Sequence, residues 1–454
     1  MPSRRYRGRF FHGLLLFFRV LLSYKLLALR NVVSSSAAKE RRLRKLHARN
    51  ALLLRERMIE QRGVFIKIGQ FLSSRVDLLP EEYTVELAKL QDQVPPAPFT
   101  DIRRRLVEEL GPMEEIFSDF NEVPIASASL GQVHRACLRD GDCIVVKVQY
   151  PGIDEVIAAD MRTIKVIMRM LRMLYSRVNL DVIYSEFSRI VTEELDYLKE
   201  GKNCETFARN FQDDQRVKFP IVYWPFTTSK VLTLEYLEGT KITDLAAIDR
   251  QGIDRKEIAR ILAGAYARMF FLNGFFHGDP HPGNIFVRPG PEIIFVDFGM
   301  VDRIAVTQRH GLRRAFAAIV DSDARGVVRA LVDMGFIPLT NDIRPLVALV
   351  ERLLGKYRNQ SLTEFKAMDI AEISDDVLAA LQLSPSIQIP NDFILFGRVI
   401  GMLNGLGSQL DPDTNLIEIA APFARKFIRA EETSPEGILR QAGTAARALV
   451  HLPR

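Results

Sequence analysis

The chain has 454 residues, enough for two domains, with 47% hydrophobic and 26% charged residues. This balance is ordinary for a folded protein, and no internal repeat or low-complexity tract interrupts it. The net charge of +6 is uneven, because residues 1–60 hold 15 lysines and arginines against three glutamates, a balance of +12 that leaves −6 for the rest. A basic arm on a slightly acidic body predicts an anionic partner, either a membrane surface or a nucleic acid.

The start of this arm, residues 1–33, is almost wholly apolar between Phe10 and Leu29. A membrane-spanning helix would place Arg19 near the bilayer centre at a cost of about 2.5–3.5 kcal/mol. A helix lying in the interface avoids that cost, so we predict attachment to an anionic membrane surface. The alternative is a helix packed on its own protein or on a second copy in a homodimer. No nucleic acid is expected, because the aromatic residues are mostly phenylalanines inside apolar runs.

The three cysteines, Cys137, Cys143 and Cys204, form no CxxC motif and no even-numbered disulfide framework. We therefore expect reduced, buried thiols. No small-residue cleavage site follows the apolar stretch, which argues against a signal peptide. These features predict a cytoplasmic protein held peripherally on the inner face of the membrane.

Residues 34–118 are predicted to be helical, with helices over 34–61, 63–70, 78–90 and 101–110. Lys67 and Gln70 lie three residues apart on one face of an otherwise apolar turn, where polar side chains need partners or water.

Residues 119–237 begin with a predicted strand, loop and strand that align with the kinase phosphate loop GxGxxGxV. Alanine replaces the first two glycines, and a plain small-residue turn is the alternative. Lys147 follows Val133 by fourteen residues inside an apolar strand, as the phosphate-binding lysine of a kinase would. A later predicted strand begins at Val231 and runs into a glycine turn at Gly239, and it corresponds to the kinase hinge. The candidate nucleotide-binding residues are Ala126, Ser127, Ala128, Ser129, Gly131, Val133 and Lys147, with the backbone of Glu235 and Leu237 at adenine.

A long helical segment is predicted over residues 152–205. Near its end the run from Glu193 to Glu200 contains acidic residues that could pair with Lys147, or that form a solvated acidic face.

The sequence HGDPHPGN at 277–284 precedes Asp297-Phe298-Gly299, with a predicted β-hairpin between them. Phosphoryl transfer needs a carboxylate facing the attacking hydroxyl, and a carboxylate and an amide oxygen holding Mg²⁺. Asp279, Asn284 and Asp297 have the kinase spacing for these roles, which predicts Mg²⁺ and ATP as cofactors. A metal cluster of His277, Asp279 and His281, or a plain turn, is the alternative.

Two kinase features are missing. No APE motif follows residue 299, and Thr307 begins a predicted helix at once. Gly278 stands where protein kinases have the arginine of HRD, so no basic residue there can receive an activation-loop phosphate. A platform for peptide substrates is therefore expected to be short or absent.

The KxGQ motif at 67–70, the alanine-rich loop, the ExD motif at 194–196 and HGDPHPGN together resemble the UbiB/AarF family of atypical protein-kinase-like proteins over residues 60 to about 415. The resemblance implies an α+β, two-lobed protein-kinase-like fold: a helical extension (34–118), an N-lobe (119–237) and a mostly helical C-lobe (238–454). It implies that Lys67, Gln70 and Glu194 gate the site, with Lys67 paired to Glu194. It also implies that Lys147 pairs with Glu200, that both act in catalysis with Asp279, and that Asn284 and Asp297 hold the metal.

Two departures from the family are visible. Residues 417–454 are amphipathic and basic, where many bacterial members have two transmembrane helices. Asn404 and Gly405 stand where a glutamate is expected, and nothing explains that difference.

Three functions fit the sequence. The leading one is an atypical kinase or ATPase at a membrane surface, supporting ubiquinone or related prenyl-lipid biosynthesis. The alternatives are a small-molecule kinase of the aminoglycoside/choline type and a non-catalytic, ATP-gated lipid-binding scaffold.

Overall fold

A computed structural model describes residues 4–31, 35–73, 79–91, 96–174, 180–335, 337, 343–358, 391–411 and 422–423. The chain divides into two compact units, residues 1–205 with 220–236 and residues 206–219 with 237–454. Helix α9 (Tyr197–Asn210) carries the chain from the first unit into the second. The four-part division of the sequence stays a prediction.

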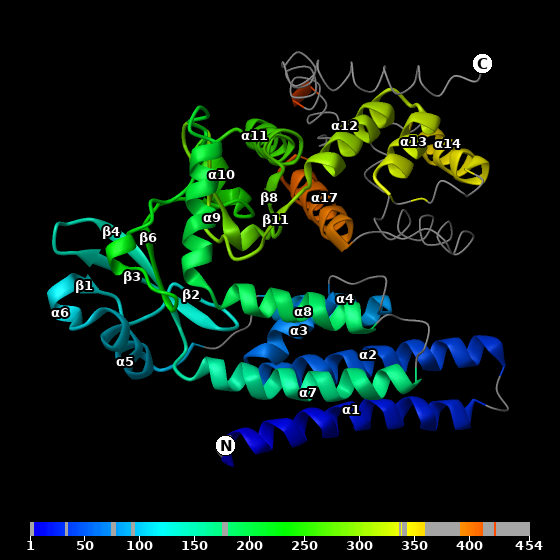
Figure 1. The fold of residues 1–454 in the computed structure, drawn as a ribbon, viewed down its shortest axis with the longest axis horizontal. Coiled ribbons are helices and arrows are strands. Elements are labelled where there is room, and N and C mark those ends of the chain that lie inside the picture. The colour runs from blue at the N-terminus through cyan, green and yellow to red at the C-terminus, as the bar shows by residue number, and fades with distance from the viewer. Residues whose placement is uncertain are drawn as a thin grey trace, which may run out of the picture. The chain divides into compact units, whose positions relative to one another are not determined.

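Helices form one half of the first unit. Figure 1 shows α1, α2, α7 and α8 lying side by side, and α1 contacts both α2 and α7. Apolar residues of α3, such as Val64 and Ile66, are fully buried and pack in one core with Phe187 of α8. The helices are α1 (Arg4–Arg30), α2 (Ser36–Gln61), α3 (Val64–Ser73), α4 (Glu81–Ala88), the 3-10 turn η1 (Lys89–Gln91), α7 (Ile153–Leu174) and α8 (Leu180–Glu194). The predicted helical N-terminal extension is therefore confirmed.

The other half is a five-stranded antiparallel sheet of order β1-β3-β4-β6, with β2 paired to β3. Its strands are β1 (Phe117–Phe120), β2 (Ala126–Ser127), β3 (Gly131–Leu138), β4 (Cys143–Gln149) and β6 (Val231–Glu235). Helices α5 (Phe99–Leu110) and α6 (Met113–Ile116) accompany it, and the 3-10 turn η2 (Trp224–Phe226) leads into β6. Ile102 and Leu106 of α5 pack on Val146 and Val148 of β4, because alternate residues of that strand face the core.

The helical segment predicted over 152–205 is broken in the structure. After α7 and α8, a two-residue turn at Leu195 and Asp196 separates α8 from α9. The Asp196 carboxylate accepts a hydrogen bond from Lys199 N at 3.2 Å, and its carbonyl accepts one from Glu200 N at 3.1 Å. Asp196 therefore begins α9 as an N-cap, and α9 starts in a new direction.

The second unit is mostly helical, as predicted for the C-lobe. A small sheet of order β5-β10-β9-β7 contains β5 (Val217–Lys218), β7 (Thr240–Lys241), β9 (Ile285–Arg288) and β10 (Glu292–Phe295), and β8 (Phe275–His277) pairs with β11 (Val301–Arg303). The helices are α10 (Leu245–Arg250), α11 (Arg255–Ala267), the π-helical η3 (Arg268–Asn273), the 3-10 turn η4 (Pro282–Asn284), α12 (Val306–Val320), α13 (Ala324–Asp333), α14 (Arg344–Arg358) and α17 (Asn391–Leu410). Helix α12 follows soon after β11, which confirms the predicted early helix at 307.

Candidate functional site

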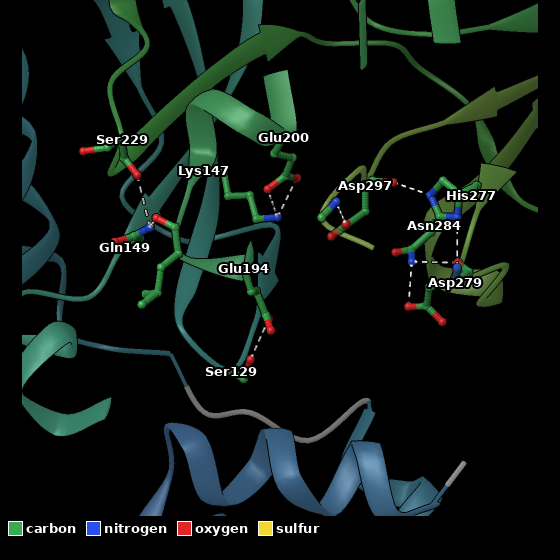
Figure 2. A network of polar contacts seen from close by, with 12 residues as sticks. Ser129, Lys147, Gln149, Glu194, Glu200, Ser229, His277, Asp279, Asn284 and Asp297 are labelled. Carbon is green, nitrogen blue, oxygen red and sulfur yellow. Dashed lines mark hydrogen bonds and ion pairs between the residues drawn. The ribbon is translucent and has the colours of Figure 1, made fainter. Parts of the chain in front are cut away.

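Lys147 lies in β4, opposite Val133 of β3 and Leu232 of β6. Its ammonium donates to both oxygens of Glu200, at 2.7 and 2.9 Å (Figure 2). The Glu200 side chain is only 3% exposed and that of Lys147 13% exposed. A lysine inside an apolar strand is thus compensated by a buried carboxylate from α9, as the family resemblance implies.

The acidic run before α9 divides between two roles. Glu193 pairs with Lys199 at 2.8 Å on the surface, whereas Glu200 lies one turn into α9 and turns to Lys147. Both sequence interpretations, a partner for Lys147 and a solvated face, therefore hold for different members of the run. The turn at Asp196 separates the two roles of the acidic run, because the last residues of α8 and the first turn of α9 then face different neighbours.

The alanine-rich loop is a tight connection between β2 and β3. Ala126 pairs with Val133, and Ala128 N donates to Gly131 O at 2.8 Å. Neither alanine adopts a left-handed φ, so neither position uses the freedom that glycine would add. Gly131 is required for space instead, since a Cβ there would lie 2.4 Å from Val148 O.

Glu194, the last residue of α8, connects this loop with the extension. Ser129 Oγ donates to Glu194 Oε1 at 3.0 Å (Figure 2), and Lys67 Nζ of α3 lies 2.6 Å from Glu194 Oε2. The second pairing implied by the family resemblance is therefore also present. Gln70 faces elsewhere, because its amide donates to Leu90 O at 3.1 Å within the extension itself.

Glu235 ends β6 at the position of the predicted hinge. Its backbone N–H donates to Ile221 O at 2.8 Å, and its carboxylate accepts from Ile221 N at 3.1 Å. Leu237 is the first residue after the chain leaves the first unit. The adenine contacts of these two residues stay a prediction.

In the second unit, His277 organises the HGDPHPGN loop. Its Nδ1 accepts a hydrogen bond from Asp279 N at 3.2 Å, so its Nε2–H donates to the carbonyl of Asp297 (Figure 2). The buried imidazole therefore hydrogen-bonds to the backbone of both motifs, HGDPHPGN and Asp297-Phe298-Gly299. The sequence indicates His277 only as part of a motif or of a metal cluster, and this positioning role emerges only from the structure.

Asn284 and Asp297 flank the predicted hairpin, which is formed by β9 and β10 with Ile285 paired to Phe295. The Asn284 amide donates to the carbonyl and the carboxylate of Asp279, both at 3.3 Å. Asp297 Oδ1 accepts from Gly299 N at 2.9 Å. The predicted trio therefore converges at one end of the hairpin.

Phe298 of the same motif is fully buried beside Phe207, Phe219 and His277, with ring centroids 5.8 to 6.1 Å apart. This aromatic cluster fixes the backbone on which Asp297 stands.

The donor chemistry of this loop fits a magnesium ion. Because the amide nitrogen of Asn284 is directed at Asp279, its carbonyl oxygen points to the side of Asp297 (Figure 2). An amide oxygen beside a carboxylate is the kind of ligand pair that Mg²⁺ prefers. The alternative cluster with His277 does not fit, since both ring nitrogens bind backbone groups. Among the described residues, no three His, Cys, Asp or Glu side chains are grouped so that they could hold a metal ion.

Helix α1 has two different faces. On one, Arg9 forms an ion pair with the fully buried Asp160 at 2.6 Å, Ser23 accepts from Asn50 at 2.9 Å, and Tyr24 contacts Tyr83. Burial raises the pKa of Asp160, and the hydrogen bond from Arg9 opposes this rise. The helix is thus packed on its own unit, which was the alternative interpretation. On the opposite side a stripe of six apolar side chains is exposed: Phe11, Leu15, Phe18, Leu22, Leu26 and Leu29.

By length and composition, residues 8–30 of α1 would suffice to cross a membrane. Arg19 and Lys25 are exposed within that stretch. The basic segment predicted over 417–454 lies outside the described residues except for 422–423.

Comparison with known proteins assigns the family. Residues 89–331 match the model of the ABC1 atypical kinase-like domain. The chain is 37% identical to the chloroplastic protein ACTIVITY OF BC1 COMPLEX KINASE 8 of Arabidopsis thaliana over 421 residues, which are 85% of this chain and 55% of that protein. It is 32% identical to the probable protein kinase UbiB of Pseudomonas paraeruginosa over 419 residues, 90% of this chain and 77% of the relative.

The solved structure of Rv3197 from Mycobacterium tuberculosis, in complex with erythromycin, is also similar. It superimposes with a TM-score of 0.55 at 27% identity and covers 83% of this chain and 95% of that one. The predicted α+β kinase-like fold is thereby confirmed. The chain belongs to the ABC1 family of atypical kinase-like proteins, the family that includes UbiB.

Proposed function

We propose that this protein binds Mg²⁺ and ATP and acts as an atypical kinase or ATPase at a membrane surface, in support of ubiquinone or related prenyl-lipid biosynthesis. The buried pair of Lys147 and Glu200 is the observation that carries the proposal. In protein kinases a strand lysine must be paired with a helix glutamate for phosphoryl transfer. The relationship to UbiB supports the lipid pathway.

In this proposal each motif residue has one task. Lys147 would bind the phosphates, and Asn284 and Asp297 would hold the metal, which supplies charge neutralisation on the transferred phosphoryl group when bound. Asp279 would orient the attacking hydroxyl of water or a lipid. The hydrogen bond that Asn284 donates to Asp279 keeps that carboxylate in place.

The test is ATP binding and phosphate release by the full chain, with and without anionic liposomes and prenylphenols. We expect Asp297→Asn to abolish divalent-dependent ATP binding, because the metal loses its carboxylate. Asp279→Asn should retain binding and lose turnover, since that carboxylate acts on the nucleophile. An equal ATP-induced thermal shift in wild type and Asp297→Asn would contradict the metal assignment, and ATP binding without any phosphate release would favour a scaffold.

Membrane attachment, on the cytoplasmic side, is supported by the exposed apolar stripe of α1 and its neighbouring cations. The side chains of Leu15 and Leu22 are 67% and 56% exposed. Insertion of such side chains, with lysine and arginine near lipid phosphates, is typical of interfacial helices.

We expect Leu15→Ser with Leu22→Ser to release the protein from anionic liposomes in a flotation assay. The matched control is Val85→Ser with Val123→Ser, whose side chains are 57% and 70% exposed outside the stripe. These substitutions are preferable to deletion of α1, because deletion would also remove the partner of buried Asp160. Equal flotation of both double variants would show that α1 is not the anchor.

A further inference from the structure

Cys137 and Cys143 differ from the buried thiols that the sequence predicted. Cys204 is buried and donates to Pro220 O at 3.2 Å, as expected of a structural thiol. Cys143 is exposed at the start of β4 and Cys137 is half-buried near the end of β3. Their sulfurs lie 3.4 Å apart. The prediction of buried thiols is therefore wrong for this pair, because the β3–β4 hairpin brings them together at its exposed end.

The backbone at this pair suits a disulfide. Cys137 and Cys143 are directly opposite each other in the antiparallel ladder. The Cys143 carbonyl accepts from Tyr236 N, on the side away from β3, so the two cysteines form a non-hydrogen-bonded pair. The Cα atoms of such pairs are about 4.5 Å apart. That separation falls inside the range of about 4.4–6.8 Å found for disulfides, so the bond needs side-chain rotation rather than rearrangement of the strands.

Exposure distinguishes Cys143 from Cys137. Arg135 is the next residue on the same face of β3, and its guanidinium carbon lies 4.3 Å from the centroid of the Tyr236 ring. The thiolate is the reactive form of a cysteine, and Cys143 is the exposed member of the pair. The hydrogen bond with Cys143 raises the pKa of Cys137, and burial adds to it, so Cys137 retains its proton. Cys143 is thus the accessible sulfur and Cys137 the neighbour that can follow it.

We propose that Cys137 and Cys143 are a dithiol–disulfide exchange site that reacts with low-molecular-weight disulfides. The Cys143 thiolate attacks one sulfur of the small disulfide, whose S–S bond breaks, and a mixed disulfide and one free thiolate result. Cys137 then loses its proton and attacks the Cys143 sulfur, which releases the second small thiol and forms the Cys137–Cys143 bond. Two electrons pass from the cysteine pair to the small disulfide, which leaves as two thiols.

The exchange site lies on the strand face that carries Lys147. Alternate residues of a strand share a face, and the registered pairs on this face are Cys137 with Cys143, then Arg135 with Val145, then Val133 with Lys147. Exposed disulfides of this kind are labile and reversible, in contrast to structural ones. The site therefore lies two residue pairs from Lys147 along the strands. At this position it can respond to the ratio of small thiols to small disulfides.

The test treats the full-length protein with oxidised glutathione, quenches with an alkylating reagent and maps each cysteine by peptide mass spectrometry. In wild type, Cys137 and Cys143 should lose alkylation together and appear as one cross-linked peptide lacking two hydrogens, reversible by dithiothreitol. Cys137→Ser should stop at a glutathione adduct on Cys143. Cys143→Ser should leave Cys137 alkylatable, and Cys204→Ala should behave as wild type.

Two results would overturn the proposal. One is a persistent glutathione adduct on wild-type Cys143 while Cys137 is still alkylated, because the second thiol would then not follow. The other is a pair that stays fully alkylated at oxidised glutathione concentrations that modify a solvent-exposed cysteine of a control peptide. Neither readout depends on nucleotide binding, so failure of the proposed kinase activity is separate from failure of this inference.

Discussion

Two lysine–glutamate pairs lie on either side of the Leu195–Asp196 turn, and they are built differently. Lys147 donates two hydrogen bonds to Glu200, whose side chain is 3% exposed. Lys67 lies 2.6 Å from Glu194, but both side chains are 17–19% exposed, and Glu194 Oε2 accepts no hydrogen bond among the described residues.

The two pairs therefore have different roles, although each joins a lysine to a glutamate. The Lys147 pair is enclosed by the strands and α9 of its own unit, where a bidentate contact compensates a deeply buried charge. The Lys67 pair is a close charge contact between the extension helix α3 and the end of α8, without hydrogen-bond geometry. A contact of that kind fastens one segment to another and can be released at lower cost.

The largest effect is expected for Lys147→Ala. It leaves the carboxylate of Glu200 buried without its cation, and breaking a buried pair in this way costs about 3–5 kcal/mol of unfolding free energy. Urea unfolding measures this loss, and we expect ATP binding to be lost as well.

A third pair on the same helices is the matched control. Lys199 and Glu193 are 2.8 Å apart, but their side chains are 47% and 24% exposed. Lys199→Ala should change the unfolding free energy by no more than about 0.5 kcal/mol. Equal losses in the two variants would remove burial as the explanation of the difference.

A smaller loss, about 3 kcal/mol at most, is expected for Lys67→Ala, because the Glu194 side chain is 19% exposed, against 3% for Glu200. ATP affinity should change little, while amide hydrogen exchange in α3 should become faster as the extension loosens. In Lys67→Ala with Glu194→Ala, part of the stability should return, since neither charge is then left alone. Strictly additive losses in this double-mutant cycle would show that the pair contributes no coupling energy.

The sequence predicted the residues that carry chemistry better than the turns that orient them. Motif spacing and family resemblance refer to individual residue positions. For this reason the sequence could predict the convergence of Asn284 and Asp297 and both lysine–glutamate pairings. The Asp196 cap could have been found as well, since an aspartate beside a helix start is a common N-cap.

Other features depend on three-dimensional pairing. The α1 sequence is apolar on most sides, so composition alone could not show that the Arg9 side is covered and the Leu15 side exposed. The Cys137–Cys143 contact depends on the register of the β3–β4 hairpin, in which Leu138 N donates to Asp142 O. A search for CxxC motifs misses such a pair, because strand register joins residues that are six apart in the chain.

A separate predicted effect concerns a neutral, hydrogen-bonded connection between the extension and the sheet of the first unit. Ala97 N donates to Gln132 Oε1 at 2.8 Å, Gln132 Nε2 contacts His134 Nε2 at 2.9 Å, and His134 Nδ1 contacts Asn121 O at 2.8 Å. Because a carbonyl only accepts, His134 Nδ1 carries the proton and Nε2 accepts from Gln132. The side chains of Gln132 and His134 are fully buried, so this chain of hydrogen bonds is complete only while the imidazole is neutral.

Burial lowers the pKa of His134 from its ordinary value near 6.5, and the hydrogen bond to Asn121 opposes this only in part. The unfolded chain therefore binds a proton at His134 more readily than the folded one, and stability rises with pH in that range. The contribution is fully present above about pH 6.5 and is lost as the pH falls toward the folded pKa, at up to about 1.4 kcal/mol per pH unit.

Urea unfolding of wild type and His134→Asn between pH 5 and 7 tests this, since all other titrating groups are shared. The variant should be less stable at pH 7, with a gap that narrows toward pH 5 because only the wild type loses this contribution. Parallel stability curves would mean that His134 is not held neutral by the fold.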